Sequence, residues 1–335
     1  MRTDAAVHRA LRCIARCLQV PSVAGLSIGK RNLVAFLVVA SGYYIAALFC
    51  IQMGIPDPNV SALWFPAGIG VAAVMLKGKR AVFGIFCGAV LMNLVSRRSM
   101  SLSVGVAACC TGEAIVGACL ATKLSQGKAA FSCPANYLKF VFFTGVVASA
   151  FFGVIGAVIL DLAGTVPRDG FWLTWIRWSS GDLLGIILLA PFLVLLFGHK
   201  HHSLGVRGTV EILVLLAGLL AVCVVNFGPS GILPIPSSGI EYFCIPFLFW
   251  AGLRFCPLEA SGAALLVGSF ATWGSLHGFG PFSNPVWHSI LRTCFVLIVT
   301  ITTMTGAVAW AQQQKNLEDT LFLYCALKAK HRNGG

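Results

Sequence analysis

Three polar side chains lie inside long apolar stretches of this sequence. Glu113 stands in A-C-C-T-G-E-A-I-V-G, Asn93 in G-A-V-L-M-N-L, and Asp182 in W-I-R-W-S-S-G-D-L-L-G, which continues as an apolar run. A carboxyl group at such a position is costly unless it finds a partner, so each should face the interior of a helix bundle. These side chains can either bind a ligand or lock helices together by hydrogen bonding.

No basic residue on its own predicted helix pairs with Glu113, and Asp182 needs a partner from elsewhere. The arginines that could reach Asp182 are Arg98, Arg177 and Arg292, the last nearly one turn inside the final apolar stretch. A ligand-sensing role and a helix-locking role both stay open for Asp182. The candidate sensing or inter-helix polar site comprises Asp182, Glu113, Asn93 and Arg292.

No other pattern of a reactive site is present. The chain lacks a phosphate-binding glycine-rich loop, a zinc-binding HExxH and a nucleophile elbow. Its 13 cysteines are scattered without a C-x-x-C pair, and the histidines His277 and His288 share one predicted loop that supplies no further metal ligand. We expect a protein that is not an enzyme and that holds neither a metal nor a cofactor.

The composition places these residues in a membrane protein. Hydrophobic residues make up 58% of the chain, charged residues 10%, and the mean hydropathy is +0.87. Soluble domains carry about 25% charged residues, whereas an apolar stretch of about 17–25 residues can cross a bilayer. We therefore predict an all-α polytopic membrane protein of about ten transmembrane helices. The stretches are 33–53, 60–76, 80–96, 102–122, 138–160, 179–197, 209–227, 240–256, 258–276 and 289–311.

The number of crossings and the orientation follow from the charges. Arg254, Pro257 and Glu259 crowd the junction of the eighth and ninth stretches, which could instead form a re-entrant hairpin and leave eight crossings. With the N-terminus inside, 19 of the 24 Lys and Arg residues fall on inner segments and 5 on outer ones. Since translocated loops are poor in Lys and Arg, we expect both termini in the cytoplasm. The net charge of +13 then reflects topology and attraction to anionic lipid, not nucleic-acid binding.

Residues 1–32 form a basic segment ahead of the first apolar stretch. On a helix, Val7, Leu11, Ile14 and Leu18 would make one apolar stripe, with arginines on the other faces. This pattern is typical of an amphipathic helix that lies on a membrane surface. We expect residues 1–32 to be cytoplasmic and to contact lipid.

Small and aromatic residues surround Asp182. Gly181 and Gly185 are four residues apart, so they share one helix face and allow another backbone to approach closely. Trp172, Trp175 and Trp178 recur every three residues, which suits an aromatic belt at the membrane interface.

A second segment, L-W-F-P-A-G-I-G, has the same character. Trp64 stands at its outer end and Pro66 falls in the first turn of the predicted helix, where proline removes no internal hydrogen bond.

These two segments, together with F-G-I-F-C-G-A-V-L-M-N-L, resemble the bacterial membrane-associated sensor family, type one (MASE-type). The resemblance covers most of residues 33–311 and implies an integral membrane sensory domain of eight to ten helices in the bacterial cytoplasmic membrane. Such domains usually precede a histidine kinase, a diguanylate cyclase or a phosphodiesterase. The residues that match the family motif are Trp64, Pro66, Gly68, Trp175, Trp178, Gly181, Gly185 and Pro191.

Residues 312–335 are expected to continue the last span as a cytoplasmic signalling helix. Leu317, Leu321 and Tyr324 have the i, i+4, i+7 spacing of a coiled-coil seam, which is compatible with a homodimer. No phosphoacceptor-histidine, cyclase or phosphodiesterase motif follows in this sequence. We therefore expect a signal to reach a separate kinase, cyclase or phosphodiesterase, or an output domain that this sequence does not contain.

Three functions fit this pattern. The first is a sensory module in which ligand binding shifts helix packing and reorients the C-terminal helix. The second is a small-molecule permease or substrate-binding membrane component, although no inverted repeat between the two halves supports it. The third is a ligand-independent membrane scaffold whose buried carboxyl groups hold helices together.

Overall fold

The computed structural model describes residues 28–53, 61–167, 170–198, 205–229, 240–282 and 288–333. All regular structure in these ranges is helical. The amphipathic helix predicted around Val7, Leu11, Ile14 and Leu18 lies outside the described residues.

The helices follow one another along the chain, joined by short connections. Their bounds are α2 Ile28–Gln52, α3 Phe65–Lys77, α4 Lys79–Val95, α5 Met100–Leu124, η2 Gly127–Ser132, α6 Pro134–Lys139, η3 Phe140–Val147, α7 Ala148–Leu162, α8 Phe171–Gly198, α9 Val206–Phe227, η4 Ile240–Phe243, α10 Cys244–Arg254, α11 Pro257–Leu276 and α12 His288–Asn333. The segments α6, η3 and α7 form one continuous helix whose middle part, η3, is a π-helix.

Each predicted apolar stretch coincides with a helical segment. Six of the described helices are long and apolar enough to cross a membrane: Asn32–Gln52, Met100–Leu124, Pro134–Leu162, Phe171–Gly198, Val206–Phe227 and Ile290–Cys325. Helix α3 has 13 residues, which is roughly 20 Å at 1.5 Å per residue and less than the roughly 30 Å of a bilayer core. The structure thus confirms an all-helical polytopic architecture. The count of ten crossings and the cytoplasmic termini stay predictions.

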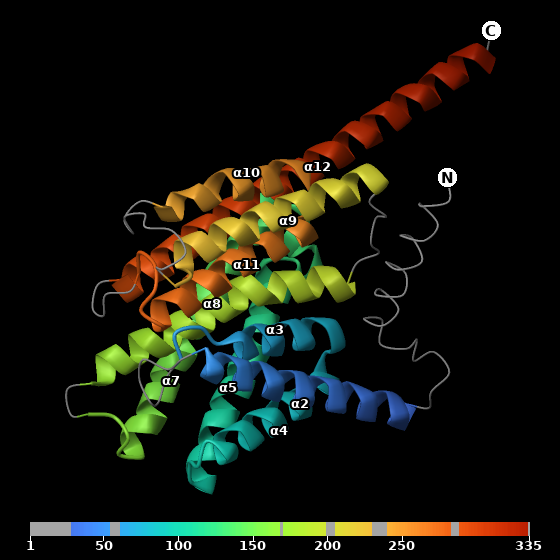
Figure 1. The fold of residues 1–335 in the computed structure, drawn as a ribbon. Helices are drawn as coiled ribbons and strands as arrows, with labels where there is room; N and C mark the ends of the chain where they lie inside the picture. Colours follow the sequence, from blue (N-terminus) through green and yellow to red (C-terminus); the bar gives the residue numbers. More distant parts are fainter. Residues whose placement is uncertain are drawn as a thin grey trace.

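Helix α8 is the central element of the bundle. It packs against α3 and α7 on one side and against α11 and α12 on the other. Helices α2, α4 and α5 complete the first group, and α9 and α10 complete the second (Figure 1). Leu184, Ile186, Ile187 and Leu188 of α8 are almost fully buried, so α8 supplies much of the hydrophobic core that both groups share.

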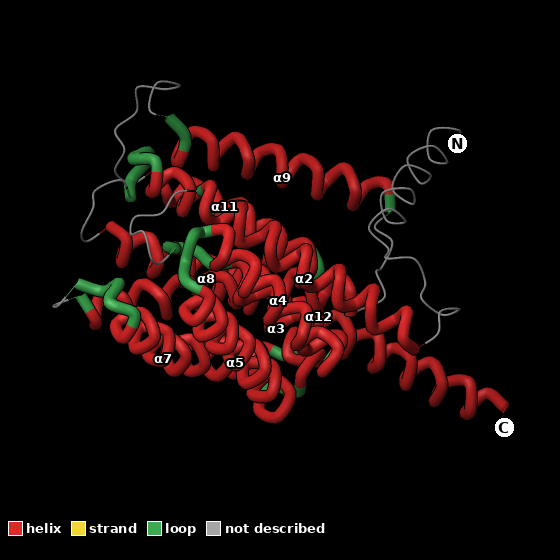
Figure 2. The backbone as a smooth tube through the Cα atoms, turned by 90° about the horizontal axis from the view of Figure 1, so that it is seen from below, coloured by secondary structure: helices red, strands yellow, loops and turns green. Residues whose placement is uncertain are grey.

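A three-helix contact joins the two groups at the middle of α8. A Cβ atom on Gly268 of α11 would touch Leu188 of α8 and Val296 of α12. The missing side chain at Gly268 therefore lets α8, α11 and α12 pack closely at one level, as small residues do between membrane helices. The view from below shows α8 and α11 running side by side (Figure 2).

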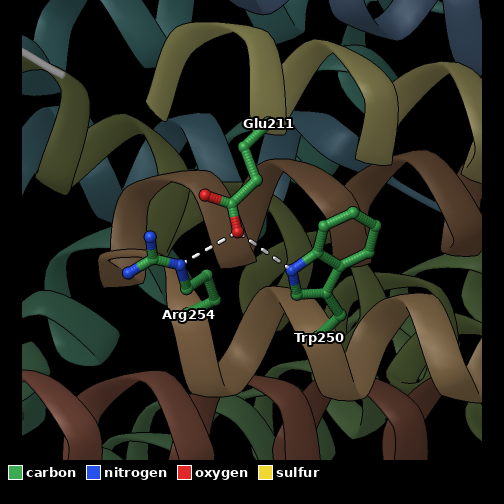
Figure 3. A network of polar contacts seen from close by, with 3 residues as sticks. All are labelled: Glu211, Trp250 and Arg254. Atoms are coloured by element: carbon green, nitrogen blue, oxygen red, sulfur yellow. Dashed lines mark hydrogen bonds and ion pairs between the residues drawn. The ribbon is translucent and has the colours of Figure 1, made fainter. Parts of the chain in front are cut away.

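A polar network joins α9 to α10 on the surface of the second group. Oε1 of Glu211 accepts a hydrogen bond from Nε of Arg254 at 2.9 Å and one from Nε1 of Trp250 at 3.3 Å (Figure 3). The Arg254 side chain is 60% exposed, so the ion pair contributes little stability.

Helix α12 has 46 residues and projects well beyond the bundle (Figure 1). Leu317, Leu321 and Tyr324 lie on its exposed part, each more than half exposed. The last span continues as a helix to Asn333, and both its signalling role in the cytoplasm and pairing through these residues stay predictions. The exposed part of α12 and the start of α2 lie at the same end of the bundle.

The sidedness can be tested by labelling single cysteines in intact bacteria. In a cysteine-free background, Ser96→Cys at the end of α4 should react with a membrane-impermeant maleimide, because we expect this end to face outward. The matched control Lys77→Cys, at the exposed turn between α3 and α4, should react only after the cells are permeabilised. Labelling of Lys77→Cys but not of Ser96→Cys in intact cells would show that the orientation is the opposite of the predicted one.

Candidate functional site

The two halves of the sequence motif meet in space. The backbone N–H of Trp64 donates a hydrogen bond of 3.0 Å to the carbonyl oxygen of Gly181. A Cβ atom on Gly185 would overlap the carbonyl oxygen of Trp64, and one on Gly68 would overlap the carbonyl oxygen of Gly185. The close backbone approach predicted for Gly181 and Gly185 is confirmed, and their partner is the other half of the motif.

Both motif prolines lie in buried positions with different effects on their helices. Pro66 stands in the first turn of α3, as predicted, where its missing N–H leaves no hydrogen bond unmade. Pro191 lies inside α8 and removes one hydrogen bond from the middle of the helix. Helix α8 therefore bends most easily near Pro191, which lies between the motif glycines and the C-terminal end of the helix.

The three tryptophans of α8 lie in different environments, so the interpretation as one aromatic belt was wrong. Trp172 is 67% exposed, as a belt requires. Trp175 donates a hydrogen bond of 2.9 Å to the carbonyl oxygen of Ala150 on α7. Trp178 is 8% exposed and packs on Gly156. A three-residue spacing advances by about 300° on a helix, so the rings rotate from the surface to the interior.

A cavity of about 440 Å³ opens beside Trp178. Its volume lies within the range of small-molecule sites, roughly 300–1,000 Å³. We call it the α2–α8 cavity because α2, α4, α5, α8 and residues 61–64 form its wall. The lining residues are Tyr43, Ile51, Ser61, Trp64, Ala89, Met92, Asn93, Ser96, Arg98, Val106, Cys110, Trp178 and Asp182.

Residues that the sequence identified as candidates, from α4, α8 and the segment 61–64, therefore line the same cavity. Asp182, Asn93, Trp64 and Trp178 all line the α2–α8 cavity. Nδ2 of Asn93 donates a hydrogen bond of 2.8 Å to the carbonyl oxygen of Ala89 on its own helix, α4.

Glu113 lies behind the cavity wall, in contact with Asp182. Each residue is 2% exposed, and their carboxyl groups interact with each other. Ser149 of α7 lies beside Glu113, and the Trp178 indole lies beside Asp182. Within the described ranges, Oε1 of Glu113 and Oδ2 of Asp182 have no hydrogen-bond partner. Glu113 and Asp182, which the sequence did not predict to be neighbours, thus form one buried acidic cluster.

The structure places Arg292 in a separate environment. Arg292 is 4% exposed, and its Nη1 donates a hydrogen bond of 3.2 Å to Oγ of Ser275 on α11. It does not line the cavity, so the structure does not bring together Asp182 and Arg292, one of the three arginines considered as its partner. The reason is that α12 contacts α8 near Leu188, whereas Asp182 belongs to the face of α8 that looks toward α2 and α5.

Arg98 is the arginine that lies in the cavity wall. It stands in the turn between α4 and α5, partly buried, and interacts with Cys110. Burial lowers its pKa from the usual value of a guanidinium.

Sequence reasoning missed Tyr43 of α2. This side chain is 1% exposed and lines the cavity. Its hydroxyl group lies beside Cys110 and Trp64, and in the described part of the chain it makes no hydrogen bond of ordinary geometry. The weak available signal was a tyrosine in the middle of an apolar span, where a phenol needs a polar neighbour. The described residues contain no group of three His, Cys, Asp or Glu that could hold a metal ion.

These features define a polytopic helical membrane protein with a cavity to whose wall both halves of one sequence motif contribute. The MASE1 family model matches residues 33–315, and the chain belongs to this family of membrane sensory domains. A search of curated proteins and a search of solved structures each found no match.

The motif contact predicts a steric effect of Gly185→Ala. The added methyl group would push the Trp64 carbonyl away from α8, which should lower the free energy of unfolding by about 1–3 kcal/mol. The measurement is SDS titration of the purified protein followed by circular dichroism. Gly42→Ala is the matched control, because a Cβ atom there meets nothing within 4 Å. Equal stability of the two variants would contradict the close contact.

The carboxyl cluster predicts a non-additive pair of substitutions. Glu113→Gln and Asp182→Asn should each raise the unfolding midpoint at neutral pH, because each removes one of two acidic groups in contact. The double variant should gain less than the sum, with a coupling of about 0.5–3 kcal/mol from a double-mutant cycle. Additive effects would mean that the two groups do not interact.

Proposed function

We propose that this protein senses a small molecule in the α2–α8 cavity and relays its presence through α8 to α12. The observation that carries this proposal is the cavity itself, whose wall includes the buried side chains of Asp182 and Tyr43. Within the described residues, Oδ2 of Asp182 has no hydrogen-bond partner. Unpaired buried polar groups are costly, and a ligand that pairs with them would be bound selectively.

Helix α8 provides the route from the cavity to α12. Its first half carries Asp182 and the motif glycines, and Pro191 interrupts its hydrogen bonds further along. Leu188 lies between these features, at the contact with Gly268 and Val296. A ligand that displaces the first half of α8 would therefore also change the packing of α11 and α12.

A second contact steadies α12 against the second helix group. A Cβ atom on Gly252 of α10 would approach the carbonyl oxygen of Thr303 on α12. Backbones that pack this closely slide or rotate as units, which favours two discrete arrangements over gradual bending.

The proposed setting is the cytoplasmic membrane of a bacterium, with the exposed part of α12 in the cytoplasm. Its partner there would be a histidine kinase or an enzyme of cyclic-di-GMP turnover, and the exposed face of α12 would let two copies pair. Membership of a sensory family supports the sensing role. A permease is the rival, and uptake of a bound solute into liposomes would favour it.

A reporter fusion tests the relay. The complete chain is fused at its C-terminus to a diguanylate cyclase domain, and cyclic-di-GMP is measured in cells. Asp182→Asn and Tyr43→Phe should change the output several-fold at equal protein levels in the membrane. Phe83→Leu is the control, since Phe83 is 65% exposed on α4 and faces away from the cavity. Wild-type output from both cavity variants would refute the proposed sensing role.

A further inference from the structure

Two buried cysteines from different helices meet in the second helix group. Cys223 lies one turn before the end of α9, and Cys244 is the first residue of α10. Both side chains are 0% exposed, and both are free thiols. They lie in hydrogen-bonding relation to each other. The sensing role proposed for the α2–α8 cavity makes no use of this pair.

A polar side chain inside the hydrophobic core is directed at the pair. Asn226 is 2% exposed, and its Nδ2 donates a hydrogen bond of 3.5 Å to Sγ of Cys244. The sulfur of a neutral thiol is a weak acceptor, whereas hydrogen bonds to an ionised group are roughly twice as strong as neutral ones. The amide of Asn226 is therefore a weak partner for a resting thiol and a strong one for a thiolate formed during a reaction.

Other buried cysteines form hydrogen bonds with the backbone. Sγ of Cys50 accepts a hydrogen bond of 3.3 Å from the N–H of Phe65, and Sγ of Cys109 donates one of 3.3 Å to the carbonyl oxygen of Phe152. A single buried cysteine acts as a small apolar filler. Two thiols in contact can do more, because one sulfur can attack the other once that other sulfur has been oxidised.

The location of the pair is compatible with oxidation. The end of α9 and the start of α10 lie at the opposite end of the bundle from the exposed part of α12 (Figure 1). With the exposed part of α12 in the cytoplasm, as proposed, this opposite end faces the periplasm. Disulfides form and persist in the bacterial periplasm but are rare in the cytoplasm.

We propose that Cys223 and Cys244 are a reversible redox site, at which hydrogen peroxide converts two thiols into one disulfide that joins α9 to α10. Because neither side chain is exposed, the oxidant has to be small and uncharged. Hydrogen peroxide meets both requirements, whereas a protein oxidant could not reach the sulfur atoms.

The oxidation is balanced over two steps. The Cys244 thiolate attacks one oxygen of hydrogen peroxide, the O–O bond breaks, and the departing hydroxide takes up the proton that Cys244 released. The Cys223 sulfur then attacks the resulting sulfenic acid, the S–O bond breaks, and the second hydroxide takes up the proton of Cys223. Two thiols and one peroxide thus give one disulfide and two waters, and the two electrons lost by sulfur reduce the peroxide oxygens. An external thiol reverses the bond by exchange.

The disulfide would act on a helix that contacts α12. It holds the two sulfur atoms about 2.05 Å apart, closer than two thiols approach without a bond. Cys244 begins α10, and Gly252 lies further along the same helix. A Cβ atom on Gly252 would approach the carbonyl oxygen of Thr303 on α12. Movement of the start of α10 would therefore reach α12 through a close backbone contact.

Peptide mapping of the full-length protein in isolated membranes tests the bond. The membranes are treated with hydrogen peroxide, dissolved in SDS with N-ethylmaleimide, and digested for mass spectrometry. We expect a cross-linked peptide that contains Cys223 and Cys244 and that disappears after dithiothreitol treatment. The matched controls Cys50 and Cys109 are also buried and should stay alkylated at the same peroxide concentration. Absence of the cross-link, or equal oxidation of the control cysteines, overturns the proposal.

Single substitutions separate the pair from general thiol reactivity. Cys223→Ala and Cys244→Ala should each abolish the dithiothreitol-reversible product, whereas Cys109→Ala should leave it unchanged. Asn226→Ala should slow its formation several-fold, and an unchanged rate would overturn the role of Asn226. If a cysteine variant fails to insert into the membrane, the peptide map of the wild type still decides. Cross-linking by diamide but not by hydrogen peroxide would show that the oxidant is wrong.

The reporter fusion measures whether the redox state reaches α12. Hydrogen peroxide should change the cyclic-di-GMP output several-fold in the wild type and leave it unchanged in Cys223→Ala. Asp182→Asn should keep the peroxide response, because the cysteine pair does not line the cavity. A disulfide that forms without any change in output overturns the coupling to α12. The cavity proposal fails separately, through wild-type output from Asp182→Asn and Tyr43→Phe.

Discussion

The contact between the Trp64 backbone and the glycines of α8 is the interaction on which the rest of the bundle depends. Inside a membrane, a backbone N–H without a partner costs several kcal/mol, and residues 61–64, directly before α3, are not helical. The Gly181 carbonyl oxygen accepts the hydrogen bond from Trp64. Gly185 leaves room for this approach because it has no side chain. The contact fixes α3 against α8 and holds Trp64 and Asp182 in one cavity wall.

The sequence supports much of the fold and part of the site. Each predicted apolar stretch corresponds to a helical segment, although η2 Gly127–Ser132 lies outside all of them. The spacing of Gly181 and Gly185 predicted the close packing. Asp182 and Asn93 were identified because polar groups at membrane depth are costly, and both line the cavity. The resemblance to a sensory family is confirmed by the family match.

Other features depended on contacts between distant segments, which spacing does not encode. The contact of Glu113 with Asp182 requires the register of α5 against α8. Arg292 was expected near Asp182 because both were assigned to the outer side of the membrane. Depth along the bundle does not specify which face of a helix a side chain occupies, and Arg292 contacts Ser275 instead. The burial of Trp178 also follows from helix rotation, not from its position near a helix end.

Because helix α12 is long, a small change in its angle displaces its far end by a large distance. Its 46 residues correspond to roughly 69 Å of continuous helix at 1.5 Å per residue. A rigid rod of that length that pivots by about 5° at one end moves its other end by about 6 Å, close to one helical turn. The same pivot of about 5° at Val296 moves the exposed residues near Leu321, which lie roughly 38 Å further along the helix, by about 3 Å. The displacement for a given rotation is set by the number of residues in the helix and does not depend on which molecule occupies the cavity.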